Sequence, residues 1–406
     1  MAFYQTPGVY VEEVDSVSQP IEVGGTNTVG FLGVAEKGPI GEATLIRDWS
    51  HYNRVFGGMH AGGWLGHGVF QFFQNGGSKC YIYNLRAPEK GTEVSAAPKK
   101  EGEASEKKEP PKNVKMGNPD GLTKLIIGKD EGPGKRTGLF AFEEIADISI
   151  VAAPGVSDTA SWDAILTHCE KCKYRVAVLD SPEEVEKGID SVPMPRDSTH
   201  GAYYFPWIQM YDPIQEKNVY APPSGGVAGI YGRVDGTRGV HKSPANEIFR
   251  TAVGLKYGIT DSEQELFNPK GVNCIRDFKR RGIRVWGART FSSKPEWRYI
   301  STRRLFCMVE QAIQDGTGWV VFEPNTRDLW KKLVRNIRAF LMLIWRAGAL
   351  FGDTPEEAFF VRCDDELNPP ESIDAGYVVV EVGMAPAKPA EFVVFRIAQK
   401  ALESNQ

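Results

Sequence analysis

The sequence predicts a protein of mixed α/β and α+β class with more than one domain. A length of 406 residues is enough for two or three hydrophobic cores. Strand-like and helix-like runs alternate through the middle of the chain, whereas the last third has two long helical patterns followed by strand-like runs. The 43 glycines and 26 prolines indicate many tight connections instead of a bundle of long helices.

The average composition excludes several classes of protein. With 41% hydrophobic and 25% charged residues, the chain is neither disordered as a whole nor a collagen-like rod. The 48 basic and 52 acidic residues give a formal net charge of −4, so the whole chain is not an electrostatic binder of nucleic acid or of membrane surfaces. The longest apolar run, residues 339–345, is far shorter than the ~20 residues of a spanning helix, which predicts no direct membrane insertion.

The start of the chain and its cysteines predict the compartment of synthesis. Residues 1–14 have neither a basic segment nor an apolar segment of the secretory type, so we expect synthesis in a cytoplasm without a signal peptide. The 6 cysteines are scattered through a chain too large to need disulfides, and we expect them to be reduced and mostly buried.

The first elements surround a segment of unusual composition. Residues 6–14 form a short strand-like run that begins with Pro and Gly. Strand-like and glycine-broken runs between residues 28 and 86, with a helix at 66–75, predict one compact α/β unit. Residues 88–119 are rich in Lys, Glu and Pro and almost free of large apolar side chains, so we expect a mobile surface loop there.

The middle of the chain predicts a parallel sheet. An apolar run at residues 148–155 indicates a buried strand, residues 161–172 have a helical pattern, and residues 174–181 indicate a second buried strand. A strand, a helix and a strand in this order predict a βαβ unit, in which the two strands are parallel.

The last third contains the most regular patterns. Residues 297–314 and 328–350 predict two helices, the second and longer of which ends before a glycine. Residues 318–324, between the helices, predict a strand. Two further strand-like runs, at residues 377–383 and 391–398, close the chain.

Two short motifs resemble ligand sites but lack the required spacing. Glycines precede Lys135 within residues 128–138, but no Ser or Thr follows the lysine as it does in a phosphate-binding loop, so we expect a mobile hairpin tip. Cys169 and Cys172 follow His168 in a helical run that has no second cysteine pair to complete four zinc ligands. Core cysteines are therefore favoured over a metal site.

A serine hydrolase is one alternative function. Asp197, His200 and Gly201 resemble the histidine motif of subtilisin-like proteases. Ser224 and Ser243 are available, but no element typical of an exposed nucleophilic serine in a tight glycine turn is present. The sequence therefore predicts no complete catalytic triad.

The strongest charge feature is the segment 276–304, which holds ten basic side chains against Asp277 and Glu296. Five aromatic side chains lie among them: Phe278, Trp286, Phe291, Trp297 and Tyr299. Interleaved cations and aromatic rings are typical of a groove for single-stranded nucleic acid, which is the second alternative function. The other interpretation is that these arginines pair with acidic groups within the fold or across an interface, and the acidic overall charge favours it.

The long helix at 328–350 has two chemically different faces. Its core face carries Trp330, Leu333, Val334, Ile337, Leu341 and Ile344. The opposite face carries a stripe of cations, which consists of Lys331, Arg335, Arg338 and Arg346. Such a stripe is either a docking surface for an acidic partner or a solvated face, and composition does not distinguish the two.

The last strand-like run is apolar on both faces. Val393, Phe395 and Ile397 alternate with Phe392 and Val394, which is typical of a strand in the interior of a sheet. A proline-containing tether at residues 385–390 precedes this run. Tethered strands at the two chain ends could be donated to the sheet of a neighbouring subunit, or they could belong to the chain's own sheet. On these residues alone the second interpretation is favoured.

Long stretches of the sequence resemble the contractile tail sheath proteins of phages and of phage-derived injection systems. Residues 273–306 and residues 316–352, which include GWVVFEPNTRDLWKKLVRNIRAFLMLIWRAG, resemble the C-terminal domain of that family. Residues 203–213 and 221–246 resemble its middle region, and the TPGVYVEEV of residues 6–14 resembles its N-terminal arm. The loop at 88–119 has no counterpart in this resemblance.

The resemblance implies a structural polymer without cofactor, metal or catalytic site. Sheath subunits of this family form a helical sleeve around an inner tube, built on a baseplate and closed by terminal cap proteins. Contraction of the sleeve drives the tube through a target cell envelope. The middle region is then a subtilisin-like α/β domain without catalytic residues. The chain would be made in a bacterial cytoplasm and assembled into a phage tail or an injection particle.

The resemblance also implies roles for particular residues. The two chain ends would be linking arms that add strands to sheets of adjacent subunits, with the arm strands formed by Val9, Tyr10, Val11, Phe392, Val393, Val394 and Phe395. The helix residues Lys331, Arg335 and Arg338 are candidates to face an acidic inner tube. These partners are protein only, so no nucleic acid is expected to bind.

The expected organisation has six parts. They are an N-terminal linking arm at 1–20, an outer α/β region at 21–87, a mobile loop at 88–119, a subtilisin-like α/β domain at 120–270, a C-terminal sheath core domain of α+β class at 271–384, and a C-terminal linking arm at 385–406.

Overall fold

A computed structural model describes residues 21–60, 62–85, 119–185, 191–392 and 394. These residues divide into two compact units, each of which is described by itself. Residues 21–23 and 312–385 belong to unit 1, and residues 24–311, 386–392 and 394 belong to unit 2. No helix among the described residues is both long enough and apolar enough to cross a membrane.

Unit 2 is built on one large mixed sheet. Its nine strands have the order β2-β3-β1-β4-β5-β6-β11-β12-β9. Neighbouring strands from β3 to β11 are parallel, whereas β2, β12 and β9 each pair antiparallel to their neighbours. In chain order, the strands are β1 (Val29–Gly33), β2 (Ala43–Ile46), β3 (Cys80–Asn84), β4 (Ile150–Ala152), β5 (Val176–Asp180), β6 (Gly201–Phe205), β9 (Glu247–Ile248), β11 (Val272–Phe278) and β12 (Gly282–Val285).

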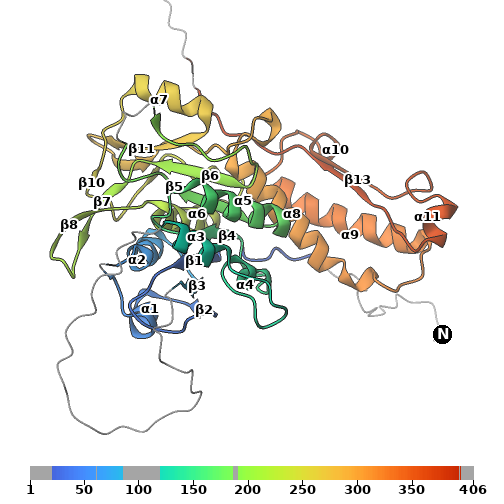
Figure 1. Cartoon of the computed structure of the whole chain (residues 1–406). Helices are drawn as coiled ribbons and strands as arrows, with labels where there is room; N and C mark the ends of the chain where they lie inside the picture. Colours follow the sequence, from blue (N-terminus) through green and yellow to red (C-terminus); the bar gives the residue numbers. More distant parts are fainter. Residues whose placement is uncertain (1–20, 61, 86–118, 186–190, 393, 395–406) are drawn as a thin grey trace, which may run out of the picture. The chain divides into compact units, whose positions relative to one another are not determined.

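Helices cover both faces of this sheet because its central strands are apolar on both sides. On β5, for example, Val176 and Val178 belong to one core cluster, whereas Ala177 and Leu179 belong to the other. The first cluster includes side chains of α1 (Trp49–Phe56), α2 (Leu65–Asn75) and α6 (Ser224–Arg238). The second includes side chains of α3 (Pro119–Ile127), α4 (Leu139–Glu143), α5 (Thr159–Cys172) and α7 (Asp261–Phe267). The two helical layers lie on opposite sides of the strands (Figure 1).

A buried carboxylate holds the start of α6. Asp180, at the end of β5, accepts hydrogen bonds from Ser224 N at 2.8 Å, Ser224 Oγ at 2.6 Å and Gly155 N at 3.1 Å. A carboxylate at a helix N-terminus satisfies free amide groups and interacts favourably with the helix dipole. Farther along, α6 packs closely against α2, and a Cβ atom on Gly225 would lie 2.2 Å from the carbonyl oxygen of Gly68.

The remaining elements of unit 2 are short. A three-stranded antiparallel sheet has the order β10-β7-β8, with β7 at Ile208–Asp212, β8 at Lys217–Ala221 and β10 at Gly254–Leu255. Two 3-10 helices, Asn268–Lys270 and Pro295–Trp297, lie within loops. A capping box formed by Thr260 and Glu263 begins α7.

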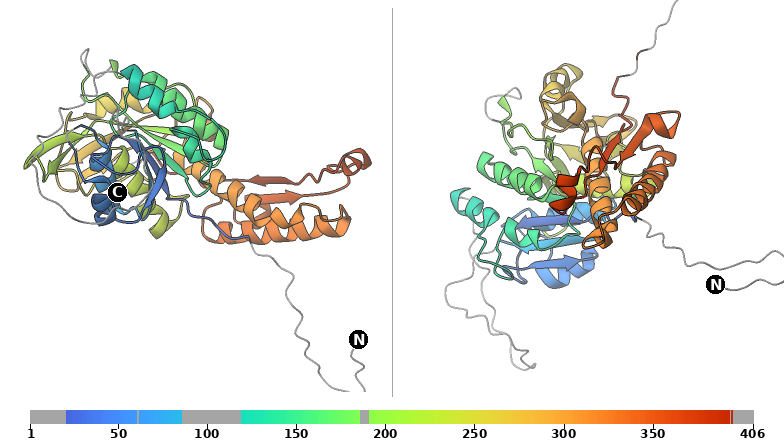
Figure 2. Two further views of the ribbon diagram at one scale, coloured as in Figure 1. Left: turned by 60° about the horizontal axis from the view of Figure 1, so that its bottom comes forward. Right: turned by 90° about the vertical axis from the view of Figure 1, so that its right-hand side faces the viewer.

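Unit 1 consists of helices and a two-stranded sheet. Its longest element is α9 (Arg327–Arg346), which Thr326 caps by accepting a hydrogen bond from Leu329 N. The helix lies beside the antiparallel strands β13 (Phe359–Arg362) and β14 (Glu381–Met384), as the left view of Figure 2 shows. The unit also contains α10 (Pro355–Ala358), α11 (Pro370–Asp374) and the end of α8 (Ile300–Gly316).

The structure confirms the mixed α/β class and much of the predicted order. The βαβ unit is present as β4, α5 and β5, whose strands pair in parallel. Both long helices of the last third are present as α8 and α9. The sheet of unit 2 takes strands from the ranges 21–87, 120–270 and 271–384, so its extent does not follow the boundaries expected from the sequence.

The predicted strand at residues 318–324 is wrong. The segment begins with a 3-10 helix, Gly318–Val320, and has no strand. Its apolar residues Trp319 and Val320 pack against Leu329, Trp330 and Leu333 of unit 1. Packing on a helix face therefore explains Trp319 and Val320, whereas Val321 and Phe322 are exposed. No neighbouring strand in the described part of the chain satisfies the backbone groups that a strand would present here.

Candidate assembly surfaces

Helix α9 carries the predicted apolar face and the predicted cationic face. Eight of its side chains are buried: Leu329, Trp330, Leu333, Asn336, Ile337, Phe340, Leu341 and Ile344. Val334, expected on the core face, is half-buried, whereas Lys331, Arg335, Arg338 and Arg346 are exposed. The exposed Lys332, which the sequence prediction missed, adds a further cation to the helix.

The exposed cations differ in how far acidic neighbours already neutralise them. Arg338 donates to Glu356 at 2.6 Å, and Lys331 lies 3.8 Å from Asp328. Arg335 forms no ion pair among the residues that the structure describes. We define the α9 ridge as Lys331, Arg335 and Arg338. The positive charge of the ridge suits an acidic partner. Arg335 is the cation of the ridge whose charge is least neutralised by acidic side chains of the described residues.

The sheet of unit 1 offers open strand edges. β13 and β14 pair from Phe359 with Met384 to Arg362 with Glu381, and neither has a second strand as neighbour in the described part of the chain. Phe360 on β13 is 50% exposed. Unpaired strand edges carry free N–H and C=O groups, which can accept an added strand.

The C-terminal arm is partly described. Phe392 and Val394 are 74% and 80% exposed. Together with Glu391 they have no strand assignment, so the predicted strand at 391–398 is absent from its described residues. Val393 and Phe395 lie outside the described residues, as do the N-terminal arm residues Val9, Tyr10 and Val11.

The arginines of the segment 276–304 pair extensively with acidic side chains of the same chain. Arg304 donates to Asp235 at 3.0 Å, and both side chains are almost fully buried. Three more pairs are shorter than 3.2 Å: Arg276 with Asp261, Arg289 with Glu391, and Arg303 with Glu310. These contacts confirm the interpretation that arginines of this segment stabilise the fold. They also remove four of its ten cations from any nucleic-acid groove.

The candidate hydrolase residues do not assemble into a triad. Ser224 donates to the buried Asp180, and Ser243 lies 3.0 Å from Ser301. The ring of His200 contacts Thr199 Oγ1 and the carbonyl oxygen of Lys173. Burial, together with the charge of Arg303, lowers the pKa of His200 to about 4. Neither serine is therefore activated by this histidine.

A second histidine, His67 on α2, makes a buried pair with Asp212. Its Nε2 atom lies 2.9 Å from Asp212 Oδ2, and both side chains are almost fully buried. Asp212 also accepts hydrogen bonds from the backbone N–H groups of Ile214 and Gln215, which form the turn after β7. The pair thus connects α2 to the small sheet.

One cluster has the donor atoms of a metal site but not its electrostatics. Glu143, His168 and Cys172 place their ligand atoms within 4.8 Å of one another. Arg175 Nη1 lies 2.9 Å from His168 Nε2, and Lys171 Nζ donates to Glu143 at 2.8 Å. These side-chain cations use the lone pairs that a metal would need. All six cysteines are free thiols, and Cys169 is buried, as expected for a core cysteine.

The loop at 128–138 is also unsuited to binding phosphate. Arg136 forms ion pairs with Asp130 and Glu144, and Gly134 N donates to Glu144 at 3.0 Å. Carboxylates of the chain therefore occupy the groups that would receive an anion.

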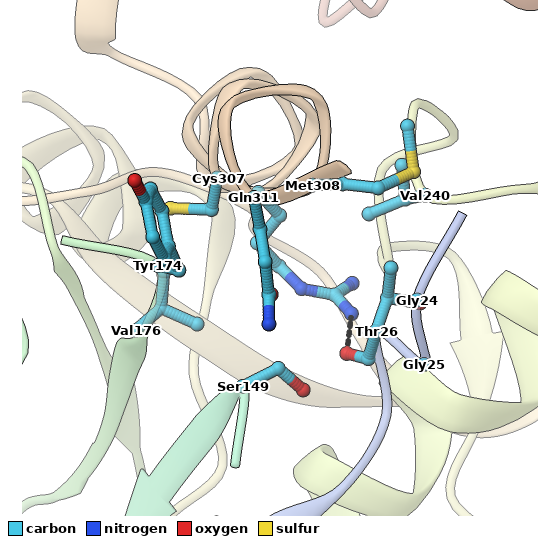
Figure 3. Close-up of a pocket in the computed structure, with 11 residues that line it drawn as sticks. Gly24, Gly25, Thr26, Ser149, Tyr174, Val176, Val240, Cys307, Met308 and Gln311 are labelled. Atoms are coloured by element: carbon cyan, nitrogen blue, oxygen red, sulfur yellow. Dashed lines mark hydrogen bonds between the residues drawn. The ribbon is translucent and has the colours of Figure 1, made fainter. Parts of the chain in front are cut away.

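A small cavity of unit 2 lies between α8 and the segment that precedes β1 (Figure 3). Labelled residues around it include Thr26, Ser149, Tyr174 and Gln311. Its volume is about 20 Å³, enough for one water molecule but far below that of a small-molecule pocket. Arg304 Nη2 donates to the carbonyl oxygen of Thr26 at 3.1 Å beside it. The cavity is thus a packing gap around a buried arginine.

Among the described residues, exposed cations of α9 and open edges of β13 and β14 are present, and the candidate hydrolase residues are not assembled into a catalytic centre. The model of the phage tail sheath protein central domain matches residues 132–291, and the model of the phage tail sheath C-terminal domain matches residues 292–400. Together they cover about two thirds of the chain. The chain belongs to the phage tail sheath family, whose members are structural subunits of contractile tails and injection systems, not enzymes.

Individual relatives agree with this assignment. The tail sheath protein of Salmonella phage ViI is 25% identical over 273 residues, which cover 59% of this chain and 42% of that protein. Among solved structures, the sheath of the extracellular contractile injection system PVC in its contracted state is 28% identical, with a TM-score of 0.74 over 98% of this chain and 99% of that one. The contracted helical sheath of the anti-feeding prophage is also 28% identical, with a TM-score of 0.73 over 98% and 100%.

Proposed function

We propose that this chain polymerises as a helical sleeve around an inner tube and contracts to drive that tube through a target cell envelope. The observation that carries the proposal is the likeness to two contracted injection-system sheaths over 98% of the chain. The homopolymer is built on baseplate proteins and closed by terminal cap proteins, in a phage tail or an injection particle assembled after synthesis in a bacterial cytoplasm.

The two chain ends act as linking arms between subunits. Residues 1–20 and 385–406 form the arms, and their strands contain Val9, Tyr10, Val11, Phe392, Val393, Val394 and Phe395. Exposed apolar side chains at Phe392 and Val394 support this role, because such groups are stabilised when a neighbour covers them. Nine extended residues reach about 30 Å, enough to cross to an adjacent subunit.

The open edges of β13 and β14 are the acceptors that fit these arms best. A strand added to each edge would complete a larger sheet with main-chain hydrogen bonds. Such ladders survive rigid-body rotation of the subunits, so the lattice stays connected while the sleeve contracts.

The α9 ridge contacts the acidic exterior of the inner tube in the extended state and separates from it on contraction. Exposure of Lys331, Arg335 and Arg338 supports this assignment. Each exposed ion pair contributes about 0–1 kcal/mol, so release from one subunit is easy. Repetition along the tube makes the extended sleeve adhere as a whole.

The regions between the arms are proposed with the boundaries expected from the sequence, although one sheet takes strands from three of them. We assign an outer region to 21–87, a surface loop to 88–119, a non-catalytic subtilisin-like domain to 120–270 and a sheath core domain to 271–384. The hydrogen bond of Ser224 to the buried Asp180 and the contact of His200 with the Lys173 carbonyl oxygen support the non-catalytic assignment.

Electron microscopy of the purified full-length chain in negative stain tests the proposed function. We expect hollow, transversely striated sleeves in which the subunits follow a helical repeat. Particles that stay monomeric at every protein and salt concentration tried would contradict the proposal, since contracted sheaths require no tube to hold them together in this mechanism.

A further inference from the structure

The root of the C-terminal arm is held by a specific polar site. The chain leaves β14 in unit 1 at Met384, and the residues from Pro386 onward belong to unit 2. We infer that Glu391 anchors the arm to unit 2, so that the arm strand leaves the subunit from a fixed point and moves with that unit. The inference rests on the proposed function and adds to it the residue that positions the arm.

The Glu391 carboxylate accepts four hydrogen bonds. Its Oε1 atom accepts from Asn268 Nδ2 and from Arg289 Nε, each at 2.9 Å. Its Oε2 atom accepts from Arg289 Nη2 at 2.6 Å and from Tyr299 OH at 3.0 Å. The two bonds from Arg289 form a bidentate pair, which is the strongest and most directional geometry for a carboxylate. We call Glu391, Asn268, Arg289 and Tyr299 the Glu391 anchor.

The groups that receive Glu391 are themselves fixed. Arg289 is 9% exposed, and its Nη1 donates to the carbonyl oxygen of Asn268 at 2.8 Å. Its backbone N–H donates to Asn273 Oδ1 at 2.6 Å, and its carbonyl accepts from Asn273 Nδ2 at 2.9 Å. Asn273 lies on β11, which pairs with β6 and β12 in the large sheet. Tension on the arm is therefore transmitted to the core of unit 2.

The change in environment directly after Glu391 is abrupt. The Glu391 side chain is 20% exposed, whereas Phe392 and Val394 are 74% and 80% exposed. A satisfied charge followed by uncovered apolar side chains is the pattern of a fixed root and a donated strand. If the segment simply packed onto its own subunit, we would expect the apolar side chains to be buried and the charge to be exposed.

The protonation of Glu391 agrees with this geometry. Burial alone would raise its pKa, but hydrogen bonds from Arg289 and Asn268 and the charge of Arg289 lower the pKa below its ordinary value of 4.5. A lowered pKa means that the anchor is complete above pH 4.5 and is lost as the pH falls through the pKa of the folded protein. The anchor is therefore charged at neutral pH.

The test compares two full-length variants with the wild type. Glu391→Gln keeps the size of the side chain but removes the charge, and Glu310→Gln is the matched control, because Glu310 also pairs with an arginine of unit 2, Arg303. Chymotrypsin cleavage after Phe392 or Phe395 is followed by intact mass, and sleeves are counted by electron microscopy. We expect Glu391→Gln to be cleaved about tenfold faster than the wild type and to form fewer sleeves, with the control unchanged.

The inference requires both the faster cleavage and the smaller number of sleeves in Glu391→Gln. Equal cleavage rates would overturn the anchor, and faster cleavage with a normal number of sleeves would overturn its role in positioning the arm for assembly. If Glu391→Gln no longer unfolds cooperatively as the wild type does, Tyr299→Phe replaces it as the test variant. Tyr299→Phe removes one hydrogen bond to Glu391, so it must show a smaller increase in cleavage rate and a smaller loss of sleeves. A wild-type chain that forms no sleeves contradicts the proposed function, whereas the cleavage rates still decide whether Glu391 holds the arm.

Discussion

At the scale of single residues, Arg304 and Asp235 form a deeply buried ion pair, with side chains 3% and 5% exposed. Asp235 also accepts from Thr26 Oγ1 at 2.7 Å, and the Arg304 guanidinium lies 4.6 Å from the centre of the Tyr231 ring. The charges of this pair are thus surrounded by hydrogen bonds and by an aromatic face, which a buried pair needs in order to be tolerated.

Asp235→Ala should destabilise the protein strongly because it leaves the Arg304 charge buried without a partner. We expect the free energy of unfolding in urea to fall by about 3–5 kcal/mol. Asp261→Ala is the control, since Asp261 pairs with Arg276 but its side chain is 89% exposed. The control should cost less than about 1 kcal/mol. Equal losses in the two variants would refute this ranking.

His168 makes unit 2 sensitive to acid. Burial, followed by the charges of Arg175 and Lys171, lowers the pKa of His168 from 6.5 to about 3. The unfolded chain therefore binds this proton more readily than the folded one between pH 6.5 and 3, and stability falls by up to about 1.4 kcal/mol for each pH unit of acidification in that window.

His168→Gln, which keeps an acceptor for Arg175, should flatten this part of the stability profile. Urea unfolding at several pH values between 6.5 and 4 measures the slope, and the variant should lose less stability over that range than the wild type. An identical slope in both proteins would show that the folded chain binds a proton at His168 as readily as the unfolded chain does, which would contradict the lowered pKa.

Single-residue roles were only partly predictable from sequence. The abundance of arginines in 276–304 suggested ion pairs, but their partners lie at distances that no local pattern encodes. Arg289 and Glu391, for instance, are separated by 102 positions. Proximity in space also produced the donor cluster of Glu143, His168 and Cys172, which the neighbouring Arg175 and Lys171 make unsuited to a metal ion.

At the scale of elements, α9 was predictable because its apolar side chains recur at helical spacing along one face. The strand predicted at 318–324 failed because a run of apolar residues indicates burial without saying whether a sheet or a helix will cover it. Trp319 and Val320 pack against α9, and that long-range contact decided the local conformation.

The α9 ridge gives a prediction about assembly at this scale. Combining Lys331→Glu with Arg335→Glu should leave the free energy of unfolding within about 0.5 kcal/mol, because both side chains are exposed. The variant should fail to assemble on the inner tube, since the charge facing an acidic surface is reversed.

Lys217→Glu with Lys270→Glu is the matched control, because it changes the net charge equally at exposed positions of unit 2. Co-sedimentation of subunits with purified tube measures the difference. Normal extended particles from the ridge variant would contradict the assignment of the ridge, and a loss of assembly in the control would attribute the effect to net charge.

At the scale of the whole molecule, the class and the alternation of elements were predictable, whereas the order of strands was not. The βαβ unit followed from strand and helix patterns close together in the chain. β6 pairs with β11 although α6, α7, a small sheet and several loops lie between them in the chain, and β12 and β9 extend the sheet antiparallel from there. Such pairings depend on the packing of the whole core, which local patterns do not contain.

The central claim is that donated arms hold the subunits together. The most direct measurement is electron microscopy of the full-length chain beside a chain that ends at Glu391. The truncated chain lacks the exposed Phe392 and Val394 and the rest of the arm but keeps the Glu391 anchor. We predict striated sleeves from the full-length chain and only dispersed subunits, with an unchanged unfolding transition, from the truncated one. Intact sleeves from the truncated chain would contradict the account.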